Sequence, residues 1–398
     1  SKRFNPGSAL HVAKRAPLLK IKSMDNETFE LLRTTVRRFV DNTLIPAENR
    51  LEEENDIPEE IIQAMRELGL FGLSIPEEYG GIGLTMSEEA QIIRELTRAS
   101  IVFRSLIGTT VGIGSQGIMM DGSEEQKREW LPRLATGEAI SSFALTEPEA
   151  GSDAASLKTV AVKDGDVYRI SGTKRFITNA QRAAVFTVMA RTEKDVPGAG
   201  GISAFVVPAN TPGISFGENE ELMGFRGVPS ADIYFDDCTV PVGNMIVPAG
   251  GFKKLMEAFD IERCGNATMA LGQASGALDD VLDYVQEREQ FGKNLIEFQA
   301  VQIKIAEMAM RVEAARLLIH RAAVNATDGL PSIFDSSLGK CFSNEMAREV
   351  CGAAVQLMGG YGYSKQYPME RRLRDSWGWG IAGGAVDIQK VNIAAAMV

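Results

Sequence analysis

The sequence predicts a mainly helical α+β protein in which helices and strands occupy separate parts of the chain. Helical patterns fill the first and last thirds of the 398 residues, whereas the middle consists of short β-rich runs separated by Gly, Pro and Asn. Because strands do not alternate with helices, a parallel sheet of βαβ units is not expected. We predict three domains: helical over residues 1–140, β over 141–248 and helical over 249–398.

The N-terminal third is predicted to be helical because its segments are long, charged and periodic. Residues 26–70 have this character, and Pro58 begins a further helix within them. The Pro- and Gly-rich stretch 74–84 predicts a loop. After this loop the helical pattern continues to about residue 135.

The middle and the C-terminal third differ in the spacing of their apolar residues. The middle contains four short β-rich runs, at 167–180, 184–190, 202–209 and 231–237. From about residue 250 the pattern is helical again. There, apolar positions that step by three or four residues predict one buried helix face, formed by Val301, Ile305, Met308, Val312, Ala315 and Ile319.

Composition excludes several classes of protein. The formal net charge of −11 argues against nucleic-acid binding, and the lack of a run of about 18 apolar residues argues against a membrane span. With only His11 and His320, neither a Ser-His-Asp triad nor a His-rich zinc site is expected, and we predict no metal. Four cysteines without a CxxC pair indicate a reducing compartment. A carboxylate or a cofactor must therefore carry any chemistry.

The N-terminal residues 1–24 contain six Lys or Arg and no Asp or Glu. This composition is weakly similar to that of a transit peptide, but we interpret the segment as an ordinary chain terminus. The expected location is the cytoplasm of a bacterium, or the mitochondrial matrix if the source is eukaryotic.

Residues 112–117, GIGSQG, match the dinucleotide-binding pattern Gly-x-Gly-x-x-Gly literally. That pattern requires a strand before it and a helix after it. Here both flanks look helical, so we interpret the match as chance or as close packing of helices through small residues.

The segment LTEPEAGSD, residues 145–153, offers polar groups to a flat ligand. Thr146 and Ser152 could hydrogen-bond the carbonyl or N–H of a ring, and Gly151 would let the backbone approach it closely. On its own, the segment would be an ordinary strand-to-loop turn.

A second segment, SGTKRFITNA at 171–180, follows about twenty residues later. It contains Phe176 and Thr178, which would lie on the same face of a regular strand. One ring could then stack on the ligand while one hydroxyl hydrogen-bonds it.

These two segments resemble the middle domain of the acyl-CoA dehydrogenases. The resemblance covers nearly the whole chain in order and continues through EREQFGK (287–293), FQAVQ (298–302), QLMGGYGY (356–363), YPMERRLRD (367–375) and IAGGAVDIQ (381–389). It implies an N-terminal helical domain, a central β domain and a C-terminal four-helix bundle. It also implies FAD held between the β domain and the bundle, in a homotetramer built as a dimer of dimers.

The resemblance also implies which residues hold FAD. Hydrogen bonds to the flavin ring would come from Thr146 and Thr178, with Phe176 packed beside it, and Ser152 would lie between cofactor and thioester. The remaining contacts are implied for Arg288, Phe291 and Gln299 at the pyrophosphate and adenosine, for Gln356 and Gly360 across a subunit interface, and for Asp387.

The catalytic base is implied to lie on the bundle. Many family members carry a Glu in a C-terminal Tyr-Glu-Gly-Thr turn, but the matching residue here is Gly383, which cannot act as a base. The isovaleryl-CoA and long-chain types instead carry the Glu within an Asp-x-Glu-Arg stretch of a bundle helix. This sequence has Asp260, Glu262 and Arg263 at that place. Glu262 is therefore the expected base, and Asp260 and Arg263 are expected near the pantetheine arm of CoA.

Two features bear on the acyl group and leave it open. Residues 103–126 are similar to a stretch of glutaryl-CoA dehydrogenase in which the residue matching Arg104 binds the distal carboxylate of the substrate. A buried cation would favour such an anionic substrate, but Arg104 could equally be salt-bridged or face solvent. The small pair Ala382 and Gly383 opens space, which favours a branched or aryl-substituted acyl group.

The expected activity is FAD-dependent α,β-dehydrogenation of an acyl-CoA thioester, with electron-transferring flavoprotein as the acceptor. One alternative keeps the fold but acts non-oxidatively on an anionic acyl-CoA, as desulfinases do. The other alternative is a non-catalytic scaffold that binds CoA thioesters without flavin.

Overall fold

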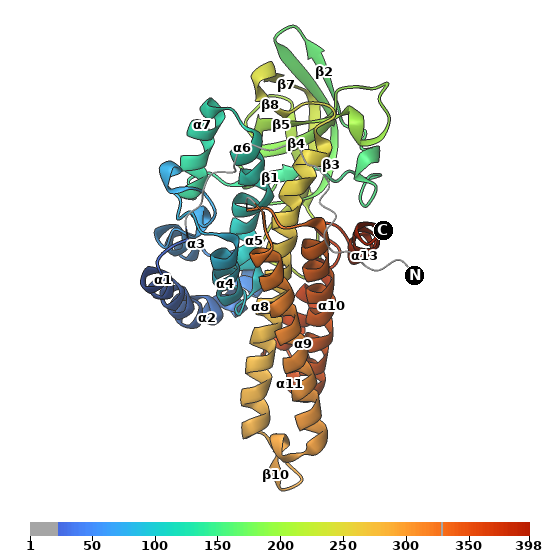
Figure 1. The fold of residues 1–398 in the computed structure, drawn as a ribbon. Helices are drawn as coiled ribbons and strands as arrows, with labels where there is room; N and C mark the ends of the chain where they lie inside the picture. Colours follow the sequence, from blue (N-terminus) through green and yellow to red (C-terminus); the bar gives the residue numbers. More distant parts are fainter. Residues whose placement is uncertain (1–22, 328) are drawn as a thin grey trace.

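The computed structural model describes residues 23–327 and 329–398, and its helices and strands form three consecutive blocks (Figure 1). The predicted α+β class is confirmed, because helical blocks precede and follow a β domain. His11 and most of the basic segment 1–24 lie outside the described residues. Within the two described ranges, no helix combines the length and apolarity that a membrane crossing requires.

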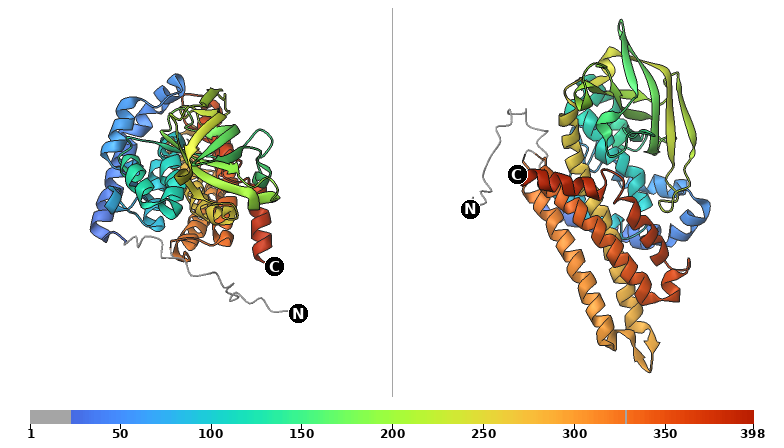
Figure 2. Two further views of the ribbon diagram at one scale, coloured as in Figure 1. Left: turned by 90° about the horizontal axis from the view of Figure 1, so that it is seen from above. Right: turned by 90° about the vertical axis from the view of Figure 1, so that its right-hand side faces the viewer.

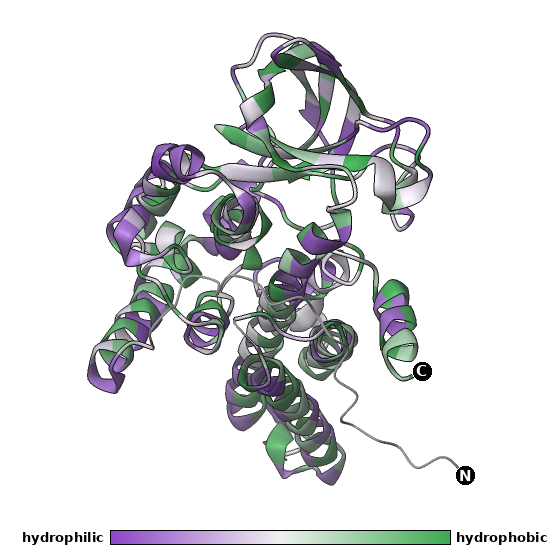
Figure 3. Cartoon of the chain, turned by 45° about the horizontal axis from the view of Figure 1, so that its top comes forward, coloured by the Kyte–Doolittle hydropathy of each residue, from purple (hydrophilic) through white to green (hydrophobic). Residues whose placement is uncertain are grey.

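The N-terminal block consists of seven α-helices and two π-helical turns among the described residues: α1 (Asn26–Phe39), the turn Val40–Leu44, α2 (Ile45–Glu54), α3 (Glu59–Glu67), α4 (Met86–Leu96), α5 (Ile101–Thr109), the turn Thr110–Gly114, α6 (Ser115–Asp121) and α7 (Glu124–Ala135). The predicted helical stretch 26–70 is divided, because Asn55 ends α2 with a left-handed backbone (φ 51°) and α3 begins after Pro58. Thr85 and Glu88 form a capping box that starts α4. Most helices show both hydrophilic and hydrophobic residues, as amphipathic helices do (Figure 3).

The β domain contains the strands β1 (Ser141–Ala144), β2 (Val160–Asp164), β3 (Val167–Thr178), β4 (Val185–Arg191), β5 (Ile202–Pro208), β6 (Ile214–Asn219), β7 (Ser230–Pro241) and β8 (Met245–Val247). The four predicted runs correspond to β3, β4, β5 and β7. The strand order is β6-β7-β3-β2-β4-β5-β8, and β1 pairs with β4 in parallel. The curved sheet encloses an apolar core that includes Ile170, Phe186, Phe205 and Ile233 (Figure 3).

The C-terminal block is built from the long helices α8 (Phe252–Glu287), α9 (Gln299–Val324) and α10 (Ile333–Met358), followed by α11 (Gly360–Tyr363), α12 (Met369–Gly378) and α13 (Val386–Ala396). The three long helices lie side by side, and α13 packs against α10 (Figures 1 and 2). A small hairpin of β9 (Glu289–Gln290) and β10 (Lys293–Asn294) joins α8 to α9 at the end of the bundle farthest from the β domain (Figure 1). On the predicted face of α9, Met308, Val312, Ala315 and Ile319 are buried, whereas the first two positions are half-buried.

Short 3-10 turns connect these elements at Leu70–Gly72, Glu77–Tyr79, Ala154–Ser156, Gly198–Gly201, Val242–Asn244 and Leu295–Glu297. Buried polar contacts tie the three blocks together around α12. Arg371 of α12 pairs with Glu48 of α2, and the Asp375 carboxylate accepts a 2.7 Å hydrogen bond from the backbone N–H of Phe225. The helix α12, which leads into the turn that contains Gly383, is therefore anchored to both neighbouring domains.

Candidate active site

Glu262 lies on α8, facing the N-terminal helices, and its side chain is only 11% exposed. Burial raises the pKa of its carboxyl above the ordinary value, while the nearby positive charges of Arg104 and Lys340 oppose this rise. The expected base is therefore a buried carboxylate that is held near two cations.

The backbone opposite Glu262 is a break between α5 and α6. In the π-helical turn Thr110–Gly114, Gly112 has non-helical angles (φ −87°, ψ −124°). A Cβ on Gly112 would collide with Oε2 of Glu262, so a side chain here would displace the carboxylate from its present position. Since helices flank the GIGSQG segment on both sides, the dinucleotide-binding interpretation is excluded, and its first glycine serves close packing instead.

Arg104 of α5 is 1% exposed, and its Nη2 lies 3.9 Å from Oε2 of Glu262. Its side chain passes so close to the backbone of Gly108 that a Cβ there would overlap Nη1. Gly265, one turn after Glu262 on α8, allows a similar approach, since its Cβ would lie 3.2 Å from Nη2. Of the two alternatives for Arg104, the salt-bridged one describes its state here, and solvent exposure is excluded.

A third charged residue of this cluster, Glu89 of α4, was not identified from the sequence. It is 7% exposed, and burial raises the pKa of its carboxyl to about 7, which Arg104 opposes and Glu262 reinforces. The available signal was its place among Met86, Ala90 and Ile93, because a carboxylate at that spacing shares the apolar face of the helix.

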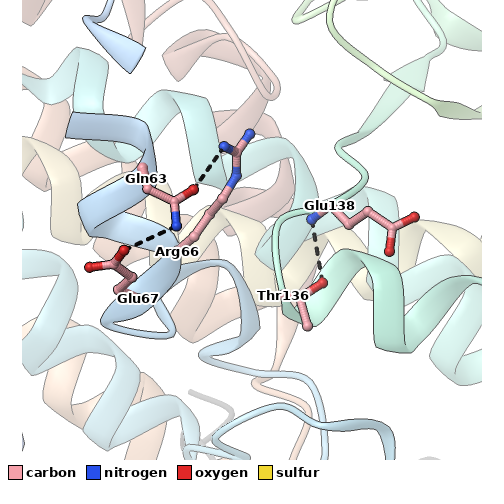
Figure 4. Close-up of a pocket in the computed structure, with 5 residues that line it drawn as sticks. All are labelled: Gln63, Arg66, Glu67, Thr136 and Glu138. Atoms are coloured by element: carbon pink, nitrogen blue, oxygen red, sulfur yellow. Dashed lines mark hydrogen bonds between the residues drawn. The ribbon is translucent and has the colours of Figure 1, made fainter. Parts of the chain in front are cut away.

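These three charged residues line one small cavity of about 20 Å³, which is bounded by α4, α5, the turn Thr110–Gly114, α8 and α9. This volume is about that of one water molecule by the same measure. A second, larger hollow of about 490 Å³ lies on the surface between α3 and the end of α7 (Figure 4). Its polar side chains hydrogen-bond one another, as Gln63 does with Glu67 at 3.1 Å, and it contains none of the predicted site residues.

The turn after α12 approaches the same region of α8. Gly383 has a left-handed backbone (φ +63°), and a Cβ on it would lie 3.7 Å from Nδ2 of Asn266, one turn beyond Glu262. Lys340 of α10 holds this turn by donating hydrogen bonds to the carbonyls of Trp379 (2.9 Å) and Ala382 (3.0 Å). Burial lowers the pKa of Lys340 to about 7.

Asp260 and Arg263, the expected neighbours of the pantetheine arm, pair with each other on α8. Asp260 also accepts a 2.7 Å hydrogen bond from the hydroxyl of Ser336. Burial raises the pKa of the Asp260 carboxyl, and Arg263 opposes this rise.

The two predicted segments of the β domain are adjacent. The backbone N–H of Arg175 donates a 2.8 Å hydrogen bond to the carbonyl of Thr146, which joins them directly. Thr146 and Thr178 are half-buried, and Ser152 is exposed. The expectation of a regular strand at 176–178 is wrong, because Phe176 has a positive φ of 56° next to a register shift of β3 against β7. Phe176 is 50% exposed, and the guanidinium of Arg175 lies over its ring at 4.8 Å from the ring centre.

The other predicted cofactor residues lie at the far end of the bundle. Arg288 ends α8, Gln299 begins α9, and Phe291 in the hairpin is 94% exposed. Arg288 stacks over the ring of Tyr361 at 5.6 Å, which brings Gly360 and the last turn of α10, with Gln356, to the same end. Within one chain this group is therefore separated from the β-domain segments by the length of the bundle (Figure 1).

The remaining predicted residue, Asp387, lies in the first turn of α13 and is exposed.

The donor types in the β domain and at the far end of the bundle suit FAD. The β domain offers hydroxyls beside an exposed aromatic ring, and the bundle end offers a guanidinium beside a second exposed ring.

Comparison with known proteins identifies the family. Models of the N-terminal, middle and C-terminal domains of acyl-CoA dehydrogenase match residues 26–138, 142–238 and 249–398. A probable acyl-CoA dehydrogenase of Mycobacterium leprae is 40% identical over 385 residues, which are 96% of this chain and 98% of that protein.

Solved structures agree with this match. Butyryl-CoA dehydrogenase from Megasphaera elsdenii superposes with a TM-score of 0.90 at 33% identity, over 94% of this chain and 99% of that one. A chain from a structure of the electron transferring flavoprotein of Acidaminococcus fermentans gives a TM-score of 0.90 at 37% identity, over 94% and 100% of the two chains. The chain thus belongs to the acyl-CoA dehydrogenase family of flavoprotein oxidoreductases.

Proposed function

We propose that this chain catalyses FAD-dependent α,β-dehydrogenation of an acyl-CoA thioester and that Glu262 removes the α-proton. The observation that carries the proposal is the placement of the Glu262 carboxylate in a buried cavity, opposite a glycine whose backbone leaves room for it. Gly383, where many family members carry the base, has no side chain and lies against the same part of α8.

The surroundings of Glu262 suit a general base. The α-proton of a thioester is weakly acidic, so the base must be ionised and should have a pKa that is not far below the working pH. Burial raises the pKa of Glu262, while Arg104 and Lys340 favour its ionised form. This combination is expected to keep the carboxylate charged and still make it a stronger base than an exposed Glu.

FAD is proposed to lie against the β domain through Thr146, Ser152, Phe176 and Thr178. When bound, FAD would supply the acceptor for the β-hydrogen, which leaves the substrate as hydride. The pyrophosphate and adenosine contacts are assigned to Arg288, Phe291 and Gln299, with Gln356 and Gly360 reaching across a subunit interface. Asp387 is retained as a further cofactor-binding residue. Because the bundle end is remote from the β domain of the same chain, we assign its contacts to a partner subunit.

Self-association is supported by an apolar stripe on α9. Ile303, Met310, Leu317 and Val324 recur every seven residues and are each at least half exposed. Such a repeat forms one continuous seam along a helix, and apolar surface of this kind usually marks an interface. We propose that the stripe is buried in a homotetramer arranged as a dimer of dimers.

The substrate contacts are proposed to involve Ser152 at the thioester, Asp260 and Arg263 at the pantetheine arm, and Arg104 at the far end of the acyl group. The sequence leaves a branched, aryl-substituted or ω-carboxylated acyl chain open. Electron-transferring flavoprotein is the proposed acceptor, which the likeness to the Acidaminococcus chain supports. We also retain the domain division at residues 140 and 248 and a cytoplasmic or mitochondrial-matrix location as proposals.

The test is anaerobic mixing of the purified protein with a panel of acyl-CoAs while the absorbance of oxidised flavin is followed. The panel pairs isobutyryl-, isovaleryl- and aryl-CoAs with succinyl-, methylsuccinyl-, benzylsuccinyl- and glutaryl-CoA. We expect at least one thioester to bleach the wild type and none to bleach Glu262→Gln. Glu313→Gln, which changes an exposed carboxylate of α9, should behave as the wild type.

Two outcomes would contradict the proposal. Protein that contains FAD but is bleached by no thioester would favour the non-oxidative, desulfinase-like alternative. Colourless protein that releases no flavin on denaturation would favour a CoA-thioester-binding scaffold.

A further inference from the structure

The charge balance of the acyl cavity is provided by the protein itself. One cation, Arg104, faces two carboxylates, Glu89 from α4 and Glu262 from α8. The other elements at the cavity contribute no charge, since the turn supplies Val111 and Gly112 and α9 supplies Ile319 and Ala323. Lys340 of α10 lies outside the cavity lining, and its positive charge opposes the rise in the pKa of Glu262.

The three cavity charges interact with one another. Arg104 lowers the pKa of both carboxyl groups, while Glu262 raises the pKa of Glu89. The guanidinium therefore has Glu262 as a countercharge before any substrate enters, and Glu89, which lines the same cavity, becomes a second one as it ionises at a pH of about 7 and above. The sequence left two possibilities open for Arg104, namely an anionic acyl chain that neutralises a buried guanidinium, or an arginine that is salt-bridged within the protein or faces solvent.

A substrate carboxylate would be the third acid around one guanidinium. Buried charge that is not matched by an opposite charge is unfavourable in a cavity that excludes water. In contrast, an uncharged acyl group adds no charge to the cluster. Nε and Nη1 of Arg104 are buried and have no hydrogen-bond partner among the described residues.

We propose that Glu89 is a specificity-determining residue. It acts as the counter-ion of Arg104 within the protein. The cavity therefore prefers an acyl group that is uncharged at its far end over one that carries a carboxylate there. This inference depends on one part of the proposed function, namely that the acyl chain of a bound CoA thioester enters this cavity past Glu262.

The experiment measures binding to the FAD-containing protein by calorimetry at pH 8.5, where Glu89 is ionised, using CoA thioethers that have no thioester carbonyl and cannot be dehydrogenated. The probes are S-butyl-CoA, S-(3-carbamoylpropyl)-CoA and S-(3-carboxypropyl)-CoA, of which the last two differ mainly in charge. We expect the wild type to bind each uncharged probe at least about ten times more tightly than the carboxylate probe. Glu89→Gln should reduce this preference by about tenfold, because the carboxylate then meets one acid fewer.

Matched controls separate charge from damage to the fold. Glu88→Gln removes a buried carboxylate from the adjacent position of α4, whose side chain bonds Ser23 and Thr85 instead of lining the cavity, and should keep the wild-type preference. Glu89→Asp retains the charge and should also keep it. If Glu89→Gln fails to retain FAD, Glu89→Met removes the charge with a side chain of similar length.

Two results would overturn the inference: wild-type protein that binds the carboxylate probe as tightly as the carbamoyl probe, or a preference that Glu89→Gln leaves unchanged. Neither depends on turnover. Absence of bleaching by acyl-CoA substrates would contradict the proposed dehydrogenation while leaving these binding ratios measurable.

Discussion

The backbone of Gly112 and the carboxylate of Glu262 pack directly against each other, and no Cβ fits between them. The contact joins the break between α5 and α6 to the middle of the molecule's longest helix, α8. It fixes one side of the Glu262 carboxylate, while Arg104 and Gly265 border another side. The position of the proposed base is thus set by two helical segments that are far apart in the sequence.

Gly112→Ala should reduce the rate of flavin bleaching by about a hundredfold, because a displacement of about 1 Å in a reacting group can have an effect of that size. Rapid mixing under anaerobic conditions measures this rate. Gly117→Ala is the matched control, since a Cβ there would meet only ordinary contacts of 3.4 Å or more. An alanine at 112 that leaves the rate unchanged would show that the carboxylate acts from another position.

The pH dependence of bleaching should report the ionisation of Glu262. A base acts in its ionised form, so the rate should rise with pH, and burial places this rise above the ordinary value of 4.5. Arg104 lowers the pKa of Glu262, so Arg104→Met should move the rise to higher pH. Arg33→Met, at an exposed ion pair of α1, should leave it in place. A shift to lower pH in Arg104→Met would contradict the assignment.

Motif and composition were enough to predict the three blocks and the strands β3, β4, β5 and β7, and they named Glu262 as the candidate base, which stays a prediction. Pattern alone did not single out β1, β2, β6 and β8, because strands of three to six residues carry too few alternating positions. The left-handed backbone of Phe176 was also not predictable, since an aromatic residue gives no local signal for a positive φ.

The charged cavity required the tertiary structure. Glu89, Arg104 and Glu262 come from three different helices, and a helical sequence pattern says which face is apolar but not which helix it meets. For the same reason, the sequence left open whether Arg104 has a countercharge within the protein. The family motifs could name candidate cofactor residues, but they could not show that one group lies at the opposite end of the bundle from the other.

Glu89 should make the stability of the protein fall as the pH rises. Burial raises the pKa of its carboxyl from 4.5 to about 7, so the folded state holds this proton more tightly than the unfolded chain does. The resulting stabilisation is complete below pH 4.5, is lost as the pH rises through about 7, and corresponds to roughly 3 kcal/mol.

From pH 5 to pH 8, the Tm of Glu89→Gln should therefore fall by a few degrees less than the Tm of the wild type. Differential scanning fluorimetry of the FAD-containing proteins measures the difference. Glu88→Gln should retain the wild-type trend, because the pKa of Glu88 is lowered from 4.5 and this group therefore titrates below the pH range that is compared. Equal pH trends in the wild type and Glu89→Gln would mean that Glu89 is ionised in the folded protein at all these pH values.

Disrupting the stripe on α9 should release FAD. We expect the double variant Met310→Glu, Leu317→Glu to dissociate, because it places charges in the proposed interface. Arg288 and Phe291 would then no longer reach the β domain of the neighbouring subunit, so the isolated subunit should lose most of its flavin. Sedimentation velocity gives the oligomeric state, and the flavin absorbance per chain after gel filtration gives the FAD content. Leu31→Glu, which changes an exposed apolar residue of α1, should alter neither. A dissociated variant that keeps its full FAD content would show that one subunit binds the cofactor alone, and the bundle-end residues would then have to be assigned another role.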